Sequence, residues 1–377
     1  MTNKTLGILG ALALLAVILA VVATRGQPRL EAADQAGQVL FPKLVNDIDK
    51  LRSLVIKHGG ETMTIDWDDK AKIFRMRERG GYPVDVEKVQ AVAVRLARLT
   101  KLEAKTKMAD RYDRLDLGDP NVKGGQATEL TLLDAGGKAF ADLIVGKRKF
   151  TLGGREGGTY VRFPNDPQTW LALGELTVGS AAHDWLKPEI ADIKDTAIKR
   201  VTVTHANGEK IVVAKGPNGF ILENMPKGME MVTPSTAEDY AKLLDTLKLD
   251  DVAEASKVTF PKDKTTTAVF EGVDGFQITL DNFDADGKYW VRLKTTPPAT
   301  KDGAADKPEA AKQIADLAAR TDGWVYQVPQ YAIVALTKSM SDITKKPDPK
   351  AAQQSAPQAM PGGMPAGLQG FGAPPRP

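Results

Sequence analysis

The sequence has no cysteine and only 3 histidines among its 377 residues. Without cysteine the chain has no disulfide, no thiol nucleophile and no cysteine-ligated zinc or iron–sulfur site. Aromatic residues make up 6% of the chain, which is little for an exposed surface that stacks on sugars or bases. We therefore expect no catalytic, cofactor-binding or metal-binding residues, and we expect the protein not to be an enzyme.

The chain also has little net charge, because its 51 Lys and Arg nearly balance its 48 Asp and Glu. Nucleic-acid-binding proteins usually carry a basic face, so no nucleic-acid partner is expected. The charge is uneven. Residues 1–29 and residues 345–377 each carry a net charge of +3, so the body between them is mildly acidic. The length suits two domains, and 42% hydrophobic residues suffice to build their cores.

One long apolar run stands near the N-terminus, over residues 6–23, and it contains no charged residue. A helix of that length covers about 27 Å, close to the ~30 Å hydrocarbon core of a bilayer. The run predicts a transmembrane helix that binds the lipid bilayer. The alternative is a signal peptide cleaved after Val21-Val22-Ala23, although signal peptides usually have apolar regions of only ~7–15 residues.

Basic residues flank this run on both sides, with Lys4 before it and Arg25 and Arg29 after it. The positive-inside rule therefore does not decide the orientation. The short segment of residues 1–5 favours a cytoplasmic N-terminus. We expect a single-pass protein of the cell (inner) membrane, with a membrane-proximal linker over residues 24–44 and a periplasmic or extracytoplasmic body.

The C-terminal end, residues 345–377, holds 8 of the 23 prolines. Its composition of Pro, Gly, Ala and Gln predicts a disordered tail, because it buries too little apolar surface to offset its conformational entropy. The alternative is a tether or a short partner-binding motif around Met360, Met364, Leu368 and Phe371.

Two stretches of the body resemble each other, residues 51–76 and residues 198–224. Both alternate apolar and polar residues and turn through glycine, at His58–Glu61 and at His205–Glu209. Alternation interrupted by such turns predicts β-hairpins. Both hairpins turn again into a third short strand, the second one at Gly216–Gly219.

A helix is expected after each hairpin group. Apolar residues recur at helical spacing from Val86 to Leu99 and from Ala237 to Leu247. The residues Ser235–Glu238 predict a capping box at the second helix. Strands follow in each half, and the closest local match is between Tyr160–Pro164 and Val325–Pro329, each followed by an apolar run.

These elements predict an α+β fold with two tandem copies of a β-hairpin/helix/antiparallel-meander unit behind one N-terminal transmembrane helix. The copies span residues 45–173 and 195–344, with an insertion at residues 295–320 that adds a short helix. Residues 174–194 are predicted to form an inter-repeat linker helix. In it Trp185, Leu186, Ile190 and Ile193 share an apolar face that packs between the copies or contacts a partner.

Three stretches resemble the family of membrane-anchored proteins known as domain of unknown function DUF4340. They are Arg111–Pro120, the residues from Ile144 to Pro164, and Asp184–Leu186 with the strand that follows it. The resemblance extends over about residues 45–336. The first stretch departs from the family form by extra residues between Tyr112 and Leu117, and the second copy lacks that element.

The resemblance implies a membrane-anchored extracytoplasmic protein of a kind often encoded beside ABC transporter permeases. A partner is therefore expected among membrane proteins, an ABC transporter permease or an auxiliary subunit. The family has no established catalytic residue to transfer to this sequence.

Several local motifs have a structural and a functional interpretation. Gly153–Gly158 lacks the Lys-Ser/Thr of a phosphate-binding loop, and Asn282–Gly287 lacks the later glutamate of a calcium loop, so both predict hairpin turns. The carboxylates Asp66, Asp68 and Asp69 are ordinary turn residues. His58 and His205 lie at matching strand ends, which repetition explains without a metal.

Three functions follow from these observations. The first is a non-enzymatic accessory or scaffold protein of an ABC-type transport complex. The second is a module that binds an envelope lipid or glycan in the cleft between the two copies, where ligands commonly bind. The third is a hydrolase whose carboxylate site has no recognisable sequence signature.

Overall fold

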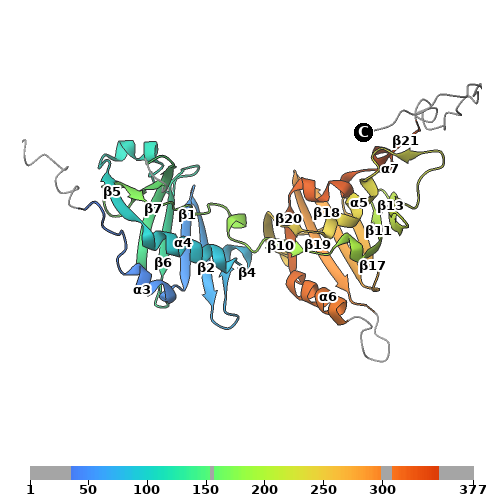
Figure 1. The fold of residues 1–377 in the computed structure, drawn as a ribbon, viewed down its shortest axis with the longest axis horizontal. Helices are drawn as coiled ribbons and strands as arrows, with labels where there is room; N and C mark the ends of the chain where they lie inside the picture. Colours follow the sequence, from blue (N-terminus) through green and yellow to red (C-terminus); the bar gives the residue numbers. More distant parts are fainter. Residues whose placement is uncertain (1–34, 153–156, 299–307, 348–377) are drawn as a thin grey trace, which may run out of the picture.

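The computed structural model describes residues 35–152, 157–298 and 308–347. The predicted transmembrane helix at residues 6–23, residues 348–377 of the predicted tail and residues 153–156 of the glycine-rich motif lie outside these ranges. None of the helices within them is both long enough and apolar enough to cross a bilayer. The fold is α+β, with two large antiparallel sheets and few helices. The sheets form two lobes that lie side by side along the longest axis of the molecule (Figure 1).

The first lobe is built on a nine-stranded sheet with the order β4-β3-β2-β1-β6-β7-β8-β9-β5. Its strands are β1 (Ser53–His58), β2 (Glu61–Asp68), β3 (Ile73–Met76), β4 (Tyr82–Pro83), β5 (Thr100–Ala104), β6 (Thr128–Leu133), β7 (Ala139–Lys149), β8 (Gly158–Arg162) and β9 (Thr169–Leu173). Its helical segments are α3 (Leu44–Asp47), η1 (Ile48–Lys50), η2 (Arg77–Arg79), α4 (Val86–Arg98) and η3 (Ala109–Leu115).

The second lobe is built on an eight-stranded sheet with the order β13-β12-β11-β17-β18-β19-β20-β16. Its strands are β11 (Ile198–Thr204), β12 (Lys210–Gly216), β13 (Gly219–Leu222), β16 (Asp251–Glu254), β17 (Thr266–Gly272), β18 (Gln277–Ala285), β19 (Lys288–Thr296) and β20 (Trp324–Val328). Two strand pairs lie outside it, β10 (Glu189–Ala191) with β15 (Leu247–Lys248) and β14 (Glu230–Met231) with β21 (Thr344–Lys345).

The remaining helices connect or cover this second sheet. They are η4 (Ala182–Asp184), η5 (Asp195–Ala197), α5 (Thr236–Ala241), η6 (Lys242–Leu244), η7 (Ala255–Lys257), α6 (Pro308–Thr321), η8 (Gln330–Thr337) and α7 (Met340–Ile343). Helix α6 lies between β19 and β20 in the chain, within the insertion expected at residues 295–320.

The predicted hairpins and the first helix form because their local signals agree. Gly59 and Gly60 make the two-residue turn between β1 and β2 with φ values of +58° and +86°, a conformation that glycine adopts without steric cost. In α4 the side chain of Asp85 accepts a hydrogen bond from the amide of Glu87 and caps the helix. Every third or fourth residue of α4 faces the core, including the buried Leu96.

The strands of the two large sheets follow in the same order. Counting from β1, the sheet continues through β6, β7, β8, β9 and β5, with β2 and β3 on the other side. Counting from β11, it continues through β17, β18, β19, β20 and β16, with β12 and β13 on the other side. This strand order shows that one match made from the sequence joins strands at different positions in the two sheets. Tyr160–Pro164 contains most of β8, the fourth strand from β1, whereas Val325–Pro329 contains most of β20, the fifth strand from β11.

The predicted capping box at Ser235 is wrong. Ser235 has helical dihedral angles, with φ −80° and ψ 0°, and its side chain makes no capping hydrogen bond. An N-cap side chain reaches the first-turn amides from a residue in the extended region. Here the turn begins earlier, because the amide of Thr236 already donates to the carbonyl of Thr233.

The predicted linker helix is also wrong over most of its length. After the short turn η4 the chain is extended, and residues 189–191 form strand β10. Pro188 has no amide to donate within a helix. Both lobes provide backbone partners instead, and these favour the extended form.

The linker, residues 183–193, hydrogen-bonds to both lobes. On the first lobe, Leu186 forms an isolated antiparallel β-bridge with Val84. The amide of Asp85 also donates to the carbonyl of Trp185 over 2.9 Å. On the second lobe, the amide of Leu249 donates to the carbonyl of Pro188, also over 2.9 Å. Trp185, Leu186 and Ile190 are buried in a core cluster that contains residues of both lobes. The linker therefore joins the lobes into one packed body.

Side chains of the two lobes also contact each other directly. The Arg79 guanidinium donates to both carboxylate oxygens of Asp251 over 2.5 and 3.0 Å. The ring of Tyr82, which is 2% exposed, packs edge-on against Trp324 and Tyr326 with centroid distances of 5.1 and 6.1 Å. Burial raises the pKa of the Tyr82 and Tyr326 hydroxyls, so both rings remain neutral in the contact.

Replacing Asp142 by asparagine is expected to stabilise the first lobe at neutral pH. Burial raises the pKa of this β7 carboxyl above its unfolded value, so its contribution to stability falls as the pH rises through these pKa values. Asparagine retains an oxygen for the Thr131 hydroxyl, which donates to Asp142 over 3.1 Å. The melting temperature should rise at pH 7 and stay unchanged at about pH 3, where the native carboxyl is already neutral.

The exposed Asp250→Asn variant is the matched control for that measurement. A gain of the same size at both pH values would contradict the role of the Asp142 charge.

Candidate functional site

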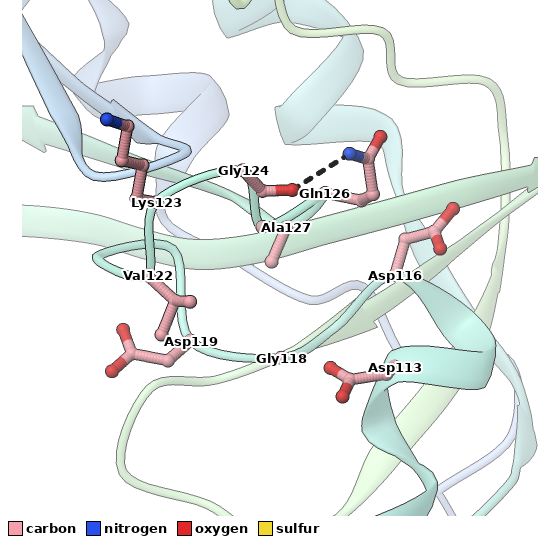
Figure 2. A pocket seen from close by; sticks show the side chains of 10 residues that line it. Asp113, Asp116, Gly118, Asp119, Val122, Lys123, Gly124, Gln126 and Ala127 are labelled. Atoms are coloured by element: carbon pink, nitrogen blue, oxygen red, sulfur yellow. Dashed lines mark hydrogen bonds between the residues drawn. The ribbon is translucent and has the colours of Figure 1, made fainter.

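A pocket of about 410 Å³ lies at the loop end of the first sheet, where the chain passes from η3 to β6 (Figure 2). Its lining comes from one segment, residues 113–127, which curls round the hollow. The segment rests on the turn between β1 and β2, because the amide of Gly60 donates to the carbonyl of Pro120 over 3.0 Å. The volume is within the range of sites for small molecules.

Three carboxylates, those of Asp113, Asp116 and Asp119, line this pocket. Asp113 lies in the 3-10 helix η3, Asp116 is the left-handed residue that ends it, and Asp119 follows in the loop. The turn of the chain at Asp116 brings the three carboxylates to the same hollow. Lys123 and Gln126 contribute the other long polar side chains of the lining.

Close backbone contact holds η3 on the sheet. A Cβ atom at Gly146 of β7 would lie 2.2 Å from the carbonyl oxygen of Leu115 and 3.0 Å from that of Asp116. A Cβ atom at Gly118 would lie 2.3 Å from Oδ1 of Asp113. At Gly146 the close atoms belong to the backbone, so only glycine allows this approach, whereas at Gly118 the Asp113 side chain could rotate away.

An arginine and a tyrosine clamp the same loop. The guanidinium of Arg162 lies 4.6 Å from the centre of the Tyr112 ring and donates to the carbonyl of Leu117 over 3.3 Å. The Tyr112 hydroxyl donates to the carbonyl of Pro167 over 2.7 Å. Beneath the loop, Leu117, Ala127 and Ile144 form a small separate core. The sequence element Arg111–Pro120 is therefore fixed by several independent contacts.

The electrostatics of the pocket favour binding over proton transfer. The amide and side-chain NH2 of Asn121 donate to Oδ1 of Asp119 over 2.9 and 2.8 Å, and they lower the pKa of this carboxyl. A carboxylate that stays ionised attracts cations and hydroxyl donors but makes a weak base. In the ranges that the structure describes, no group of three or more acidic or histidine residues is arranged to hold a metal ion.

Asp116 joins this pocket to a second hollow of about 360 Å³. The residue ends η3 in the left-handed conformation with φ +57°, which aspartate adopts more readily than most residues. Phe150, at the C-terminal end of β7, lines the second hollow and is 70% exposed. Arg148 also lines it and forms an ion pair with Glu175.

The two histidines at matching strand ends each contact a threonine of the neighbouring strand. Nδ1 of His58 lies 3.0 Å from the hydroxyl of Thr128, and Nδ1 of His205 lies 3.4 Å from that of Thr266. The interactions connect β1 with β6 and place His205 beside β17.

The acidic turn between β2 and β3 is stabilised by its own contacts. Asp66 accepts from Arg77, and Asp68 accepts from Arg75 and from backbone amides of its turn. Asp69 accepts from the indole of Trp67 over 3.0 Å. Asp69 lies in the turn, and Asp68, the last residue of β2, accepts from its amides. The sequence prediction of a turn residue is wrong for Asp66, which lies within β2 and pairs with Arg75 of β3.

The calcium-like motif is a hairpin turn, as the sequence predicts. Asp286 and Gly287 connect β18 to β19 with positive φ values of 56° and 82°. The carboxylate of Asp284 accepts a hydrogen bond from the amide of Gly287 over 2.7 Å. The glycine-rich motif lies between β7 and β8, which pair antiparallel.

Sequence reasoning did not identify Asp113, Asp116 and Asp119 as a group. The signal was present, because aspartate stands at every third position from Asp110 to Asp119. Only Asp110 and Asp113 of this series lie in the 3-10 helix η3. Asp116 and Asp119 reach the pocket through the loop that follows, and spacing in the sequence does not predict the path of a loop.

The family comparison covers the pocket, the linker and the Arg79–Asp251 pair of the junction, but not Trp324 or Tyr326. A family model described as Domain of unknown function (DUF4340) matches residues 74–268, from β3 to β17. No curated protein and no solved structure matches the chain. The matched residues make up more than half of the chain, and it therefore belongs to the family of the domain of unknown function DUF4340.

Proposed function

We propose that this chain is a non-enzymatic accessory or scaffold protein of an ABC-type membrane transport complex. Residues 6–23 would anchor it in the cell membrane with the two lobes outside the cytoplasm. The observation that carries this proposal is the junction, where Arg79 pairs with Asp251 and Tyr82 packs on Trp324. A pair of lobes locked in this way presents a fixed surface to a partner, as a scaffold requires.

We also propose that the two lobes are tandem copies of one structural unit. The shared strand order of the two large sheets supports this. So does the contact between a strand-end histidine and a threonine in both lobes. Duplication would give the two lobes related surfaces that meet a partner at two points.

Packing at the junction counts against a ligand in a cleft between the copies. Trp185, Leu186 and Ile190 would line such a cleft, and each is at most 1% exposed. A second candidate function remains, because the pocket of residues 113–127 has the size and polarity to bind a hydroxyl-rich or cationic ligand such as a glycan.

Site-specific photo-crosslinking in cells tests the accessory role. Tyr331 is 79% exposed, and large exposed apolar side chains often mark interaction sites. A photoreactive amino acid at Tyr331 should crosslink to a permease or auxiliary subunit of an ABC transporter, and the same group at the exposed Lys227 is the control. The proposal fails if no such subunit is crosslinked and the chain is purified alone from mild detergent.

A second experiment tests the orientation. The chain has no cysteine, so Ala36→Cys introduces one unique thiol at an exposed position. A membrane-impermeant maleimide should label it in intact spheroplasts. Labelling only after lysis would place the body in the cytoplasm.

A further inference from the structure

The tip of the hairpin between β7 and β8 combines positive charge with an exposed aromatic ring. Residues 147–149 are Lys-Arg-Lys and residue 150 is Phe. We define residues 147–152 as the hairpin tip. The Phe150 side chain is 70% exposed, although phenylalanine is among the residues most often buried in folded proteins.

The side chains of these residues alternate between the two faces of the strand. Side chains two apart lie on the same face of a strand. Arg148 and Phe150 are in contact, with 4.7 Å between the guanidinium carbon and the ring centre. Arg148 is held by its ion pair with Glu175 and by a hydrogen bond to Thr177. The Phe150 ring therefore packs against Arg148 and otherwise remains exposed to solvent.

Of the two lysines of the tip, Lys147 is exposed and Lys149 is half-buried. Within the described part of the chain, neither Lys147 nor Lys149 forms an ion pair. Glu175 is the partner of Arg148, and Asp116 lines the adjacent hollow without bonding to either lysine. Alternation places these lysines on the strand face opposite to Arg148 and Phe150. A surface that meets the end of the hairpin can contact both faces, and lysine together with an exposed aromatic ring is a combination that interfacial segments use on anionic membranes.

The tip also lies near the point where the chain enters the first lobe. Strand pairing places Lys149 opposite Gly158, Gly158 opposite Leu173, Leu173 opposite Thr100, and Thr100 opposite Val39. Neighbouring strands are ~4.8 Å apart, so this row is about 19 Å long. The entering segment at Val39 and Lys149 of the tip therefore lie about 19 Å apart along one row of the lobe.

Chain length limits the distance from this region to the bilayer. Residues 24–34 separate the apolar run from the first described residue. Eleven residues extend over at most about 40 Å. This step rests on the proposed anchor at residues 6–23, and it keeps the tip within reach of a lipid surface.

We propose that the hairpin tip docks on anionic lipid headgroups, with Lys147 and Lys149 binding the headgroups and Phe150 inserting at the interface. The contact would fix the orientation of the first lobe on the membrane. It adds a second lipid contact to the proposed anchor at residues 6–23.

A fluorescent label tests the proposal on the full chain. Thr151→Cys gives a unique thiol at the tip for an environment-sensitive dye. The labelled chain is reconstituted into vesicles of phosphatidylcholine with or without phosphatidylglycerol. We expect a blue shift of the emission and weaker quenching by aqueous iodide only with phosphatidylglycerol, and the loss of both in high salt.

Two variants and a control site test whether the tip residues cause the blue shift. Lys147→Glu/Lys149→Glu should abolish the shift and Phe150→Ser should reduce it. A dye at Lys288→Cys, in the β18–β19 hairpin of the second lobe, should stay unchanged. The proposal is overturned if the emission is the same in both vesicles or if charge reversal leaves the shift intact. It is equally overturned if the tip is protected in native membranes but not in anionic vesicles, because an acidic protein would then be the partner.

Carbonate extraction of the same vesicles separates this proposal from the anchor. Chains that leave the vesicles in carbonate disprove the anchor at residues 6–23. The dye still reports whether the tip contacts lipid before extraction, so the two failures are distinguishable.

Discussion

Replacing Gly146 by alanine should displace the loop that forms the pocket and lower the free energy of unfolding by about 1–3 kcal/mol, the usual cost of overpacking. The new Cβ would lie 2.2 Å from the carbonyl oxygen of Leu115. Both atoms belong to rigid elements, β7 and η3, so neither side chain rotation nor a small shift relieves the clash. Urea unfolding measures the loss of stability.

Hydrogen exchange locates the damage. Amides of residues 109–127 should exchange faster in Gly146→Ala, while those of β11 and β17 in the second lobe keep their protection. Gly136→Ala is the matched control, since its Cβ would contact only the side-chain oxygen of Asp134 at 3.3 Å. Unchanged exchange in the loop would show that the pocket does not depend on the approach at Gly146.

Replacing Tyr82 by alanine should uncouple the two lobes. The ring is 2% exposed and packs on Trp324 and Tyr326, and truncation of a buried aromatic side chain to alanine typically costs about 3–5 kcal/mol. The loss falls on the contact between the lobes. Calorimetry should therefore show one unfolding transition for the unchanged protein and two for the variant.

Two further variants serve as comparisons for the loss of stability in Tyr82→Ala. Arg79→Ala removes an ion pair whose side chains are about one-third exposed, so a smaller loss of about 1 kcal/mol is expected. Tyr331→Ala removes a ring that is 79% exposed and should leave the melting curve unchanged. A Tyr82→Ala protein that still unfolds in one transition at the original temperature would refute the locked junction.

Local signals in the sequence were enough for most hairpins and for the first helix. Gly59-Gly60 and Asp286-Gly287 sit at turns that need positive φ values, which few other residue pairs allow. The apolar period from Val86 to Leu99 matches a helix whose capping residue, Asp85, stands directly before it. In these cases the neighbours in sequence are also the neighbours in space, so the pattern contains the whole interaction.

The two wrong predictions about helices have different causes. Ser235–Glu238 has the residues of a capping box, but the chain is already turned there, because the amide of Thr236 donates to the carbonyl of Thr233. The linker has apolar residues at roughly helical spacing, but it pairs with residues 83–85 on one side and with Leu249 on the other. These partners are more than fifty residues away and provide hydrogen bonds that the local pattern cannot show.

The sequence by itself determined the α+β class, the positions of the turns, the acidic body between two basic ends and the family. Tertiary structure alone decided the pocket, the junction and the environment of the hairpin tip. The pocket depends on Gly146 admitting the backbone of Leu115, and the junction on Tyr82 meeting Trp324 across 242 positions of sequence. Such contacts depend on how sheets and loops pack, and packing brings together residues that share no local pattern.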